Sequence, residues 1–226
     1  MKTYFLKLFF VKGLIAKSLL VKVIALKFIF LILGCNSEHK KIKFETPEAV
    51  KKELINGNQR FLSGDFKHIN YKSDILHTKS AQHPYALVLG CMDSRVPPEI
   101  IFDQGIGKIF VERVAGNLED PNIIGSIEYA VKFKKIKLIV VLGHTNCGAI
   151  QGTLDKVKLG NLTQLTGQIQ ESFTANEAQH HVALNVNKTI RDILDKSDEI
   201  RIQAYNDKID IVGAFYEVET GQVKFL

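Results

Sequence analysis

Three short apolar runs in the middle of the chain, at 85–90, 108–112 and 137–143, each end in glycine or a charged residue. Continuous apolar runs of about four to eight residues are typical of strands that are buried on both faces of a parallel sheet. Between the second and third runs, residues 123–134 carry apolar side chains at helical spacing, which predicts a strand–helix–strand unit. The pattern therefore predicts an α/β fold with a mostly parallel central sheet flanked by helices.

Elements are also expected on both sides of this unit. Thr46 followed by Pro47 is a typical helix start, with an N-cap hydroxyl and a proline at the first helical position, and it predicts an N-terminal helical arm. Residues 66–83 are polar, and no regular element is predicted there. We expect a helix, a strand and a short C-terminal edge strand over residues 178–194, 209–218 and 223–226.

The first 35 residues differ in composition from the rest of the chain. They contain six lysines and no acidic residue, and their last apolar run, 28–35, is followed at once by polar residues. A basic start, an apolar segment and an abrupt polar exit are typical of a secretory signal. An uncleaved membrane anchor is the alternative, but the lysine-free runs are shorter than the roughly 18–20 residues that a membrane span needs.

The end of this segment also resembles a bacterial lipoprotein box, although Leu33 stands where a small residue is usual. Cys35 is therefore a candidate for lipidation. We expect a signal or lipoprotein-type leader over 1–35, a tether over 36–45, and an exported protein that is periplasmic or membrane-anchored. Contact with a membrane is expected only through the leader or its lipid.

The leader also explains the formal net charge of +6. Without its six lysines the chain has 24 basic residues against 24 acidic ones. The remaining sequence has no excess of positive charge that would bind a polyphosphate, so we expect no nucleic-acid partner.

Two of the predicted strands end in residues that bind zinc. Cys91 follows the first run, and His144 and Cys147 follow the third. The carboxyl ends of parallel strands meet at one edge of the sheet, where ligands usually bind. Two thiolates and one imidazole, with a fourth position for water or Asp93, are a typical set for catalytic zinc. A Cys91–Cys147 disulfide is the alternative in an oxidising compartment.

The residues around these ligands resemble a known family. Residues 91–96 (Cys-Met-Asp-Ser-Arg-Val) and 143–149 (Gly-His-Thr-Asn-Cys-Gly-Ala) are similar to the signature pair of β-class carbonic anhydrases. Further motifs in family order lie at 57–61, 114–117, 126–130 and 213–216. The resemblance implies a β-carbonic anhydrase domain over 46–226. It also implies a Zn²⁺ enzyme that hydrates carbon dioxide to bicarbonate and a proton.

The resemblance also implies roles for individual residues. The family's zinc ligands fall on Cys91, His144 and Cys147. Its aspartate–arginine dyad falls on Asp93 and Arg95. Its substrate-pocket positions fall on Gln82, Phe110, Tyr129 and the backbone N–H of Gly148. In the family this pocket forms between two subunits, so a homodimer or a tetramer is implied.

The dyad has a specific chemical purpose in this scheme. Asp93 is expected to accept a hydrogen bond from the zinc-bound hydroxide, which orients a lone pair toward carbon dioxide. Arg95 is expected to keep Asp93 ionised and turned away from the metal. Without that hold, Asp93 could become the fourth zinc ligand in a closed state.

Two other functions are compatible with the same residues. Some relatives hydrolyse carbonyl sulfide or carbon disulfide on the same scaffold, and pocket shape decides between these substrates. A non-catalytic zinc-binding surface domain is the second alternative, but it would need neither the Asp93–Arg95 dyad nor Gln82.

Overall fold

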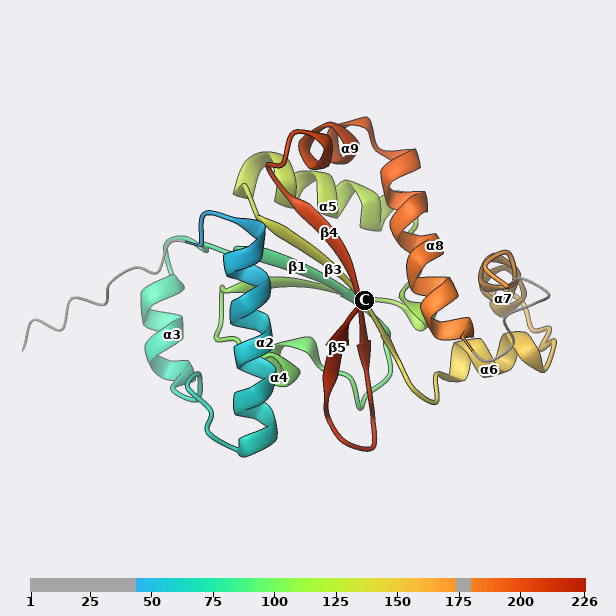
Figure 1. Ribbon diagram of the computed structural model, residues 1–226, viewed down its shortest axis with the longest axis horizontal. Coiled ribbons are helices and arrows are strands. Elements are labelled where there is room, and N and C mark those ends of the chain that lie inside the picture. Colours follow the sequence, from blue (N-terminus) through green and yellow to red (C-terminus); the bar gives the residue numbers. More distant parts are fainter. Residues whose placement is uncertain (1–43, 174–179) are drawn as a thin grey trace, which may run out of the picture. The chain divides into compact units, whose positions relative to one another are not determined.

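The computed structural model describes residues 44–173 and 180–226, in which a five-stranded sheet lies between two groups of helices (Figure 1). The strands are β1 (Ala86–Gly90), β2 (Ile109–Arg113), β3 (Leu138–His144), β4 (Asp210–Tyr216) and β5 (Val223–Phe225). Their order in the sheet is β2-β1-β3-β4-β5, and all neighbours are parallel except β4 and β5. The predicted α/β fold with a C-terminal edge strand is confirmed.

Helices cover both faces of the sheet (Figure 1). One face packs against α2 (Pro47–Ser63) and α4 (Pro98–Ile101). The other face packs against α5 (Pro121–Lys134), α8 (His181–Lys196) and α9 (Asp198–Tyr205). The remaining helical elements are α3 (Tyr71–Thr78), the 3-10 turn η1 (Ala115–Asn117), α6 (Gly148–Leu154) and α7 (Leu162–Gln170).

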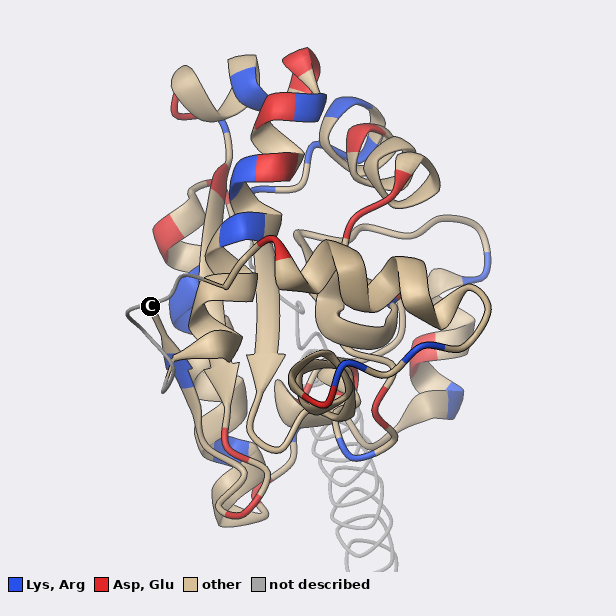
Figure 2. Ribbon diagram, turned by 90° about the vertical axis from the view of Figure 1, so that its right-hand side faces the viewer, with Lys and Arg blue, Asp and Glu red and all other residues tan. Residues whose placement is uncertain are grey.

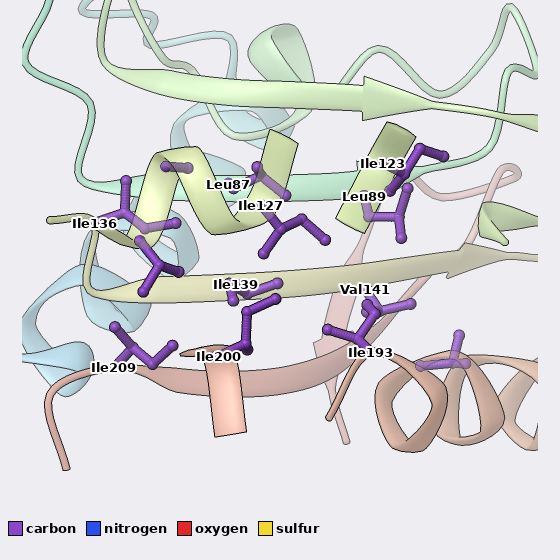
Figure 3. Close-up of a cluster of buried hydrophobic side chains, with 13 residues drawn as sticks. Leu87, Leu89, Ile123, Ile127, Ile136, Ile139, Val141, Ile193, Ile200 and Ile209 are labelled. Atoms are coloured by element: carbon purple, nitrogen blue, oxygen red, sulfur yellow. The ribbon is translucent and has the colours of Figure 1, made fainter. Parts of the chain in front are cut away.

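Every residue of β1 and β3 is buried, and alternate side chains enter two different cores. Leu87 and Leu89 of β1 point with Ile139 and Val141 of β3 toward α5, α8 and α9 (Figure 3). The intervening residues, which include Val88 and Val140, pack against α2 and α4. The continuous apolar runs of the sequence are therefore explained by helices on both faces.

The predicted start of the N-terminal helical arm is confirmed. The Thr46 hydroxyl accepts the backbone N–H of Ala49 at 3.2 Å, and Pro47 is the first residue of α2. This bond satisfies one of the backbone donors that a helix leaves free at its start.

Residues 66–83, for which no regular element is predicted, contain α3. The helix is capped by Asn70, whose side chain accepts the N–H of Ser73 at 3.1 Å. None of its residues is buried, so its sequence lacks the apolar periodicity from which helices are recognised.

On the helices at the top of Figure 2, basic and acidic residues are interspersed along the ribbon rather than gathered by sign. No helix within the described residues is both long and apolar enough to cross a membrane. The predicted leader, most of the tether over 36–45, and Cys35 lie outside the described residues.

Candidate metal centre

The carboxyl ends of β1 and β3 bring three potential metal ligands together. Cys91 follows β1, His144 is the last residue of β3, and Cys147 precedes α6. The strands are parallel neighbours, with Gly90 paired to Leu142, so both chains leave the sheet at the same edge. The ligand atoms of the three residues all lie within 4.8 Å of one another, and all three residues are buried. Both cysteines are free thiols, so the alternative disulfide is not formed.

The His144 ring offers one nitrogen for a metal. Its Nδ1 lies 2.9 Å from the carbonyl oxygen of Thr145, which can only accept, so Nδ1 carries the proton. Nε2 is completely buried and has no hydrogen-bond partner among the described residues. A buried nitrogen without a partner is unfavourable unless a ligand occupies the site, and an imidazole nitrogen within 4.8 Å of two thiols fits zinc.

Backbone N–H groups surround the two sulfur atoms. Those of Gly116 and Asp93 act to lower the pKa of Cys91, and those of Ala149 and Ile150 act to lower the pKa of Cys147. A hydrogen bond from the Cys147 thiol lowers the pKa of Cys91 to about 4, with further help from His144. The same bond raises the pKa of Cys147, since its proton is shared with Cys91. The surroundings therefore stabilise a thiolate at Cys91, one of the two that zinc coordination requires.

An apolar cluster encloses the cysteines on the protein side. It consists of Cys91, Cys147, Leu118, Ile150 and Ile169. These walls exclude water from the sulfur atoms and strengthen electrostatic interactions at the site.

Asp93 and Arg95 form the predicted pair beside the ligands. Nε and Nη2 of Arg95 donate to the two carboxylate oxygens at 3.0 and 2.7 Å, and the Arg95 backbone N–H adds a third bond at 2.9 Å. These hydrogen bonds hold the pKa of Asp93 well below its usual range. Nη2 also donates to the carbonyl oxygen of Asn146 at 3.2 Å, which ties the two ligand loops together.

Arg113, at the end of β2, was missed in the sequence analysis. Its guanidinium donates to the carbonyl oxygen of Cys91 at 3.0 Å and to that of Asp93. It reaches them because β2 runs parallel to β1, with Arg113 paired to Gly90. A charged residue directly after the apolar run 108–112 was the signal that the sequence offered, and it became specific only once this register was known.

The four predicted pocket residues do not line one common hollow in a single chain. Phe110 and Tyr129 line a hollow of about 610 Å³ beside β2 and α5, and none of the three ligands lines it. Gln82 is exposed, and Gly148 is the first residue of α6. Their substrate-binding roles stay predictions.

Comparisons with known proteins identify the family to which the domain is similar. A family model described as carbonic anhydrase matches residues 86–223. Carbonic anhydrase 2 of Mycobacterium tuberculosis is 35% identical over 191 residues, which cover 78% of this chain and 91% of that protein. The carbonic anhydrase of Mycolicibacterium smegmatis is 37% identical over 198 residues, with 79% and 92% covered.

Solved structures show the same relationship. The Coccomyxa β-carbonic anhydrase in complex with acetazolamide matches with a TM-score of 0.62 and 28% identity, over 76% of this chain and 84% of that one. One of two tetrameric β-carbonic anhydrases from Sordaria macrospora matches with a TM-score of 0.61 and 25% identity, over 78% and 96%. Because family model, sequence relatives and fold agree over most of its length, the chain belongs to the β-class carbonic anhydrases and is an enzyme of that family.

Proposed function

We propose that the protein catalyses the reversible hydration of carbon dioxide to bicarbonate and a proton with zinc held by Cys91, His144 and Cys147. The main support is the buried Nε2 of His144, which has no partner among the described residues and lies with two thiols inside a 4.8 Å cluster. Bound there, zinc would supply Lewis acidity, which lowers the pKa of a coordinated water to about 7 in the well-studied three-histidine enzyme.

The chain's own contribution begins with Asp93. Its ionised carboxylate can accept a hydrogen bond from the attacking water and so orient a lone pair toward the carbon of carbon dioxide. Arg95 occupies both carboxylate oxygens, which keeps Asp93 deprotonated and turned away from the ligand position. A closed state, with Asp93 as fourth ligand, would require the hydrogen bonds between Arg95 and Asp93 to break.

The pocket residues complete the proposal. Gln82, Phe110, Tyr129 and the N–H of Gly148 would bind carbon dioxide or bicarbonate in a pocket that a second subunit closes. The exposed rings of Tyr129 and Phe133, 5.6 Å apart on α5, are suited to an interface and support this assignment. We propose a homodimer or a tetramer, and the Sordaria macrospora relative is described as tetrameric.

The composition of residues 1–35 supports an exported, periplasmic or membrane-anchored enzyme, with Cys35 as its lipidation site. Fatty-acid labelling of the wild type and of Cys35→Ser in cells tests this assignment. Label that is present in the wild type and lost in the variant is expected. Equal labelling of the two proteins would contradict it.

Stopped-flow hydration of carbon dioxide, with zinc measured on the same sample, tests the function. We expect rapid hydration with about one zinc per chain, and loss of both in Cys147→Ser. Gln151→Ala is the matched control, because Gln151 is exposed one turn later on α6 and its side chain donates to Asp155, away from the ligands. Zinc without hydration would point to carbonyl sulfide or carbon disulfide as substrate, or to a binding role. A zinc-free protein would overturn the proposal.

A further inference from the structure

Asn185 on α8 is a buried amide with an unusual set of contacts. Its side chain is 1% exposed, and its Nδ2 donates to the carbonyl oxygen of Gly116 at 2.7 Å. Its Oδ1 is buried and has no hydrogen-bond partner among the described residues. A half-satisfied amide is an unfavourable way to fill a core, so packing alone does not explain its presence.

The residue that Asn185 holds is itself in contact with the metal centre. A Cβ on Gly116 would lie 3.4 Å from the side chain of Ala149 in α6, just after Cys147, and the backbone N–H of Gly116 helps to lower the pKa of the Cys91 thiol. Gly116 has a φ of 71°, and a Cβ at this position would lie 2.8 Å from Cδ1 of Ile169. Gly116 is therefore confined by Ala149, by Ile169 and by the amide of Asn185.

The position of α8 makes this contact possible. Gly143, next to His144 in β3, faces Val182 and Val186 of α8. A Cβ on Gly143 would lie 2.6 Å from Val182 and 2.8 Å from Val186, so only the lack of a side chain allows so close an approach. Asn185 lies between these two valines in the sequence, and the helix is held where its amide reaches Gly116.

We infer that Asn185 is a positioning residue of the metal centre, which acts through Gly116 on the Cys91 sulfur. By holding the Gly116 carbonyl, it keeps the N–H of the same residue directed at the thiolate. Hydrogen bonds of this kind orient metal ligands and tune their charge, and their loss typically costs about 10- to 100-fold in metal affinity. The inference rests on the proposed zinc function.

Thr189 provides a matched control on the same helix. It lies one turn after Asn185, is 1% exposed, and its Oγ1 also lacks a partner among the described residues. A change of Thr189 to valine therefore removes a buried, unpartnered polar group of α8 without removing a bond to Gly116.

The first experiment measures zinc affinity of the full chain by competition with a chromophoric chelator. Asn185→Leu, which keeps the size but removes the donor, should bind zinc at least about tenfold more weakly than the wild type. The cobalt-substituted variant should show a shifted thiolate-to-cobalt charge-transfer band. Thr189→Val should match the wild type in both measurements. Equal affinity and an unchanged band in Asn185→Leu would overturn the inference while leaving the proposed function intact.

A second measurement needs no variant and applies even if Asn185→Leu does not fold. In cadmium-113-loaded, nitrogen-15-labelled wild-type protein, the amide proton of Gly116 should show scalar coupling to the metal through the Cys91 sulfur. Absence of that coupling, in a protein that binds one cadmium per chain, would overturn the inference alone. A wild-type chain that binds neither zinc nor cadmium would overturn the proposed function, and the inference with it.

Discussion

Asn58 on the α2 side of the sheet and His144 at its carboxyl edge are both buried polar residues, but their polar atoms are satisfied differently. Asn58 donates to the carbonyl oxygens of Ile101 and Gly221 at 3.2 and 2.9 Å, and accepts the N–H of Val223 at 2.9 Å. The Nε2 of His144 has no partner among the described residues. The chain satisfies the first residue completely, whereas the second needs something that binds from outside. His144 differs from Asn58 both in this unpaired atom and in the two thiols beside it, and the two features together mark it as a ligand-binding residue.

The largest expected effect concerns His144, the ligand-binding residue of the two. His144→Asn should lower the rate of carbon dioxide hydration by about 10³-fold or more, because without the metal the pKa of the attacking water returns from about 7 toward 15.7. The metal-free protein should keep its stability, since the lost nitrogen has no protein partner. Stopped-flow rates and chemical unfolding of chelator-treated samples check both halves. Rapid hydration by a zinc-free His144→Asn protein would contradict the assignment.

A change at Asn58, the structural residue of the two, should lower stability and leave zinc binding unchanged. Asn58→Leu removes three buried hydrogen bonds and leaves two carbonyls and one N–H unpaired. At about 1 kcal/mol for each bond, the free energy of unfolding should fall by roughly 2–4 kcal/mol, with zinc affinity unchanged. Urea unfolding and chelator competition measure the two quantities. Gln59→Ala, at an exposed neighbour on α2, is the control and should change neither. A stable Asn58→Leu protein with weakened zinc binding would reverse the comparison.

Zinc binding should change the free energy of unfolding of the Asn58 and His144 variants by different amounts. A ligand that binds only the folded state, at about 100 times its Kd, stabilises that state by about 2.7 kcal/mol. The wild type and Asn58→Leu should both gain this amount in unfolding experiments with and without zinc. His144→Asn should gain little, and an equal gain would show that the metal binds elsewhere.

The smallest effect concerns the pH dependence of stability. Arg95 holds the pKa of Asp93 below its usual range, so the pair stabilises the folded protein above the ordinary aspartate pKa of about 3.9, and this contribution is lost as the pH falls below it. The Arg95 side chain is 48% exposed, so solvent screening keeps this contribution small. Arg95→Ala should therefore melt slightly below the wild type at neutral pH, and the difference should vanish in acid. A difference that grows on acidification would contradict this role.

The sequence predicted the elements whose cause is local or follows from burial on both faces. The runs that became β1 and β3 and the Thr46 cap of α2 are of this kind. Helix α3 was missed because all of its residues are at least partly exposed and no apolar stripe marks it. Arg113 was missed because its target, the turn after Cys91, lies 22 residues away and is reached only through the register of β1 with β2.

The sequence by itself determined which residues could bind a metal and that each follows a strand. It did not determine that these strands are neighbours, because β1 pairs with both β2 and β3 and the order in the sheet differs from the order in the chain. Nor could it show that Asn185 holds Gly116 across 69 residues, or that Gly116 lies against Ala149 and Ile169 beside the two cysteines. Hydrophobic patterning acts through local spacing and burial, whereas the direction of one N–H toward one sulfur depends on how separate elements pack.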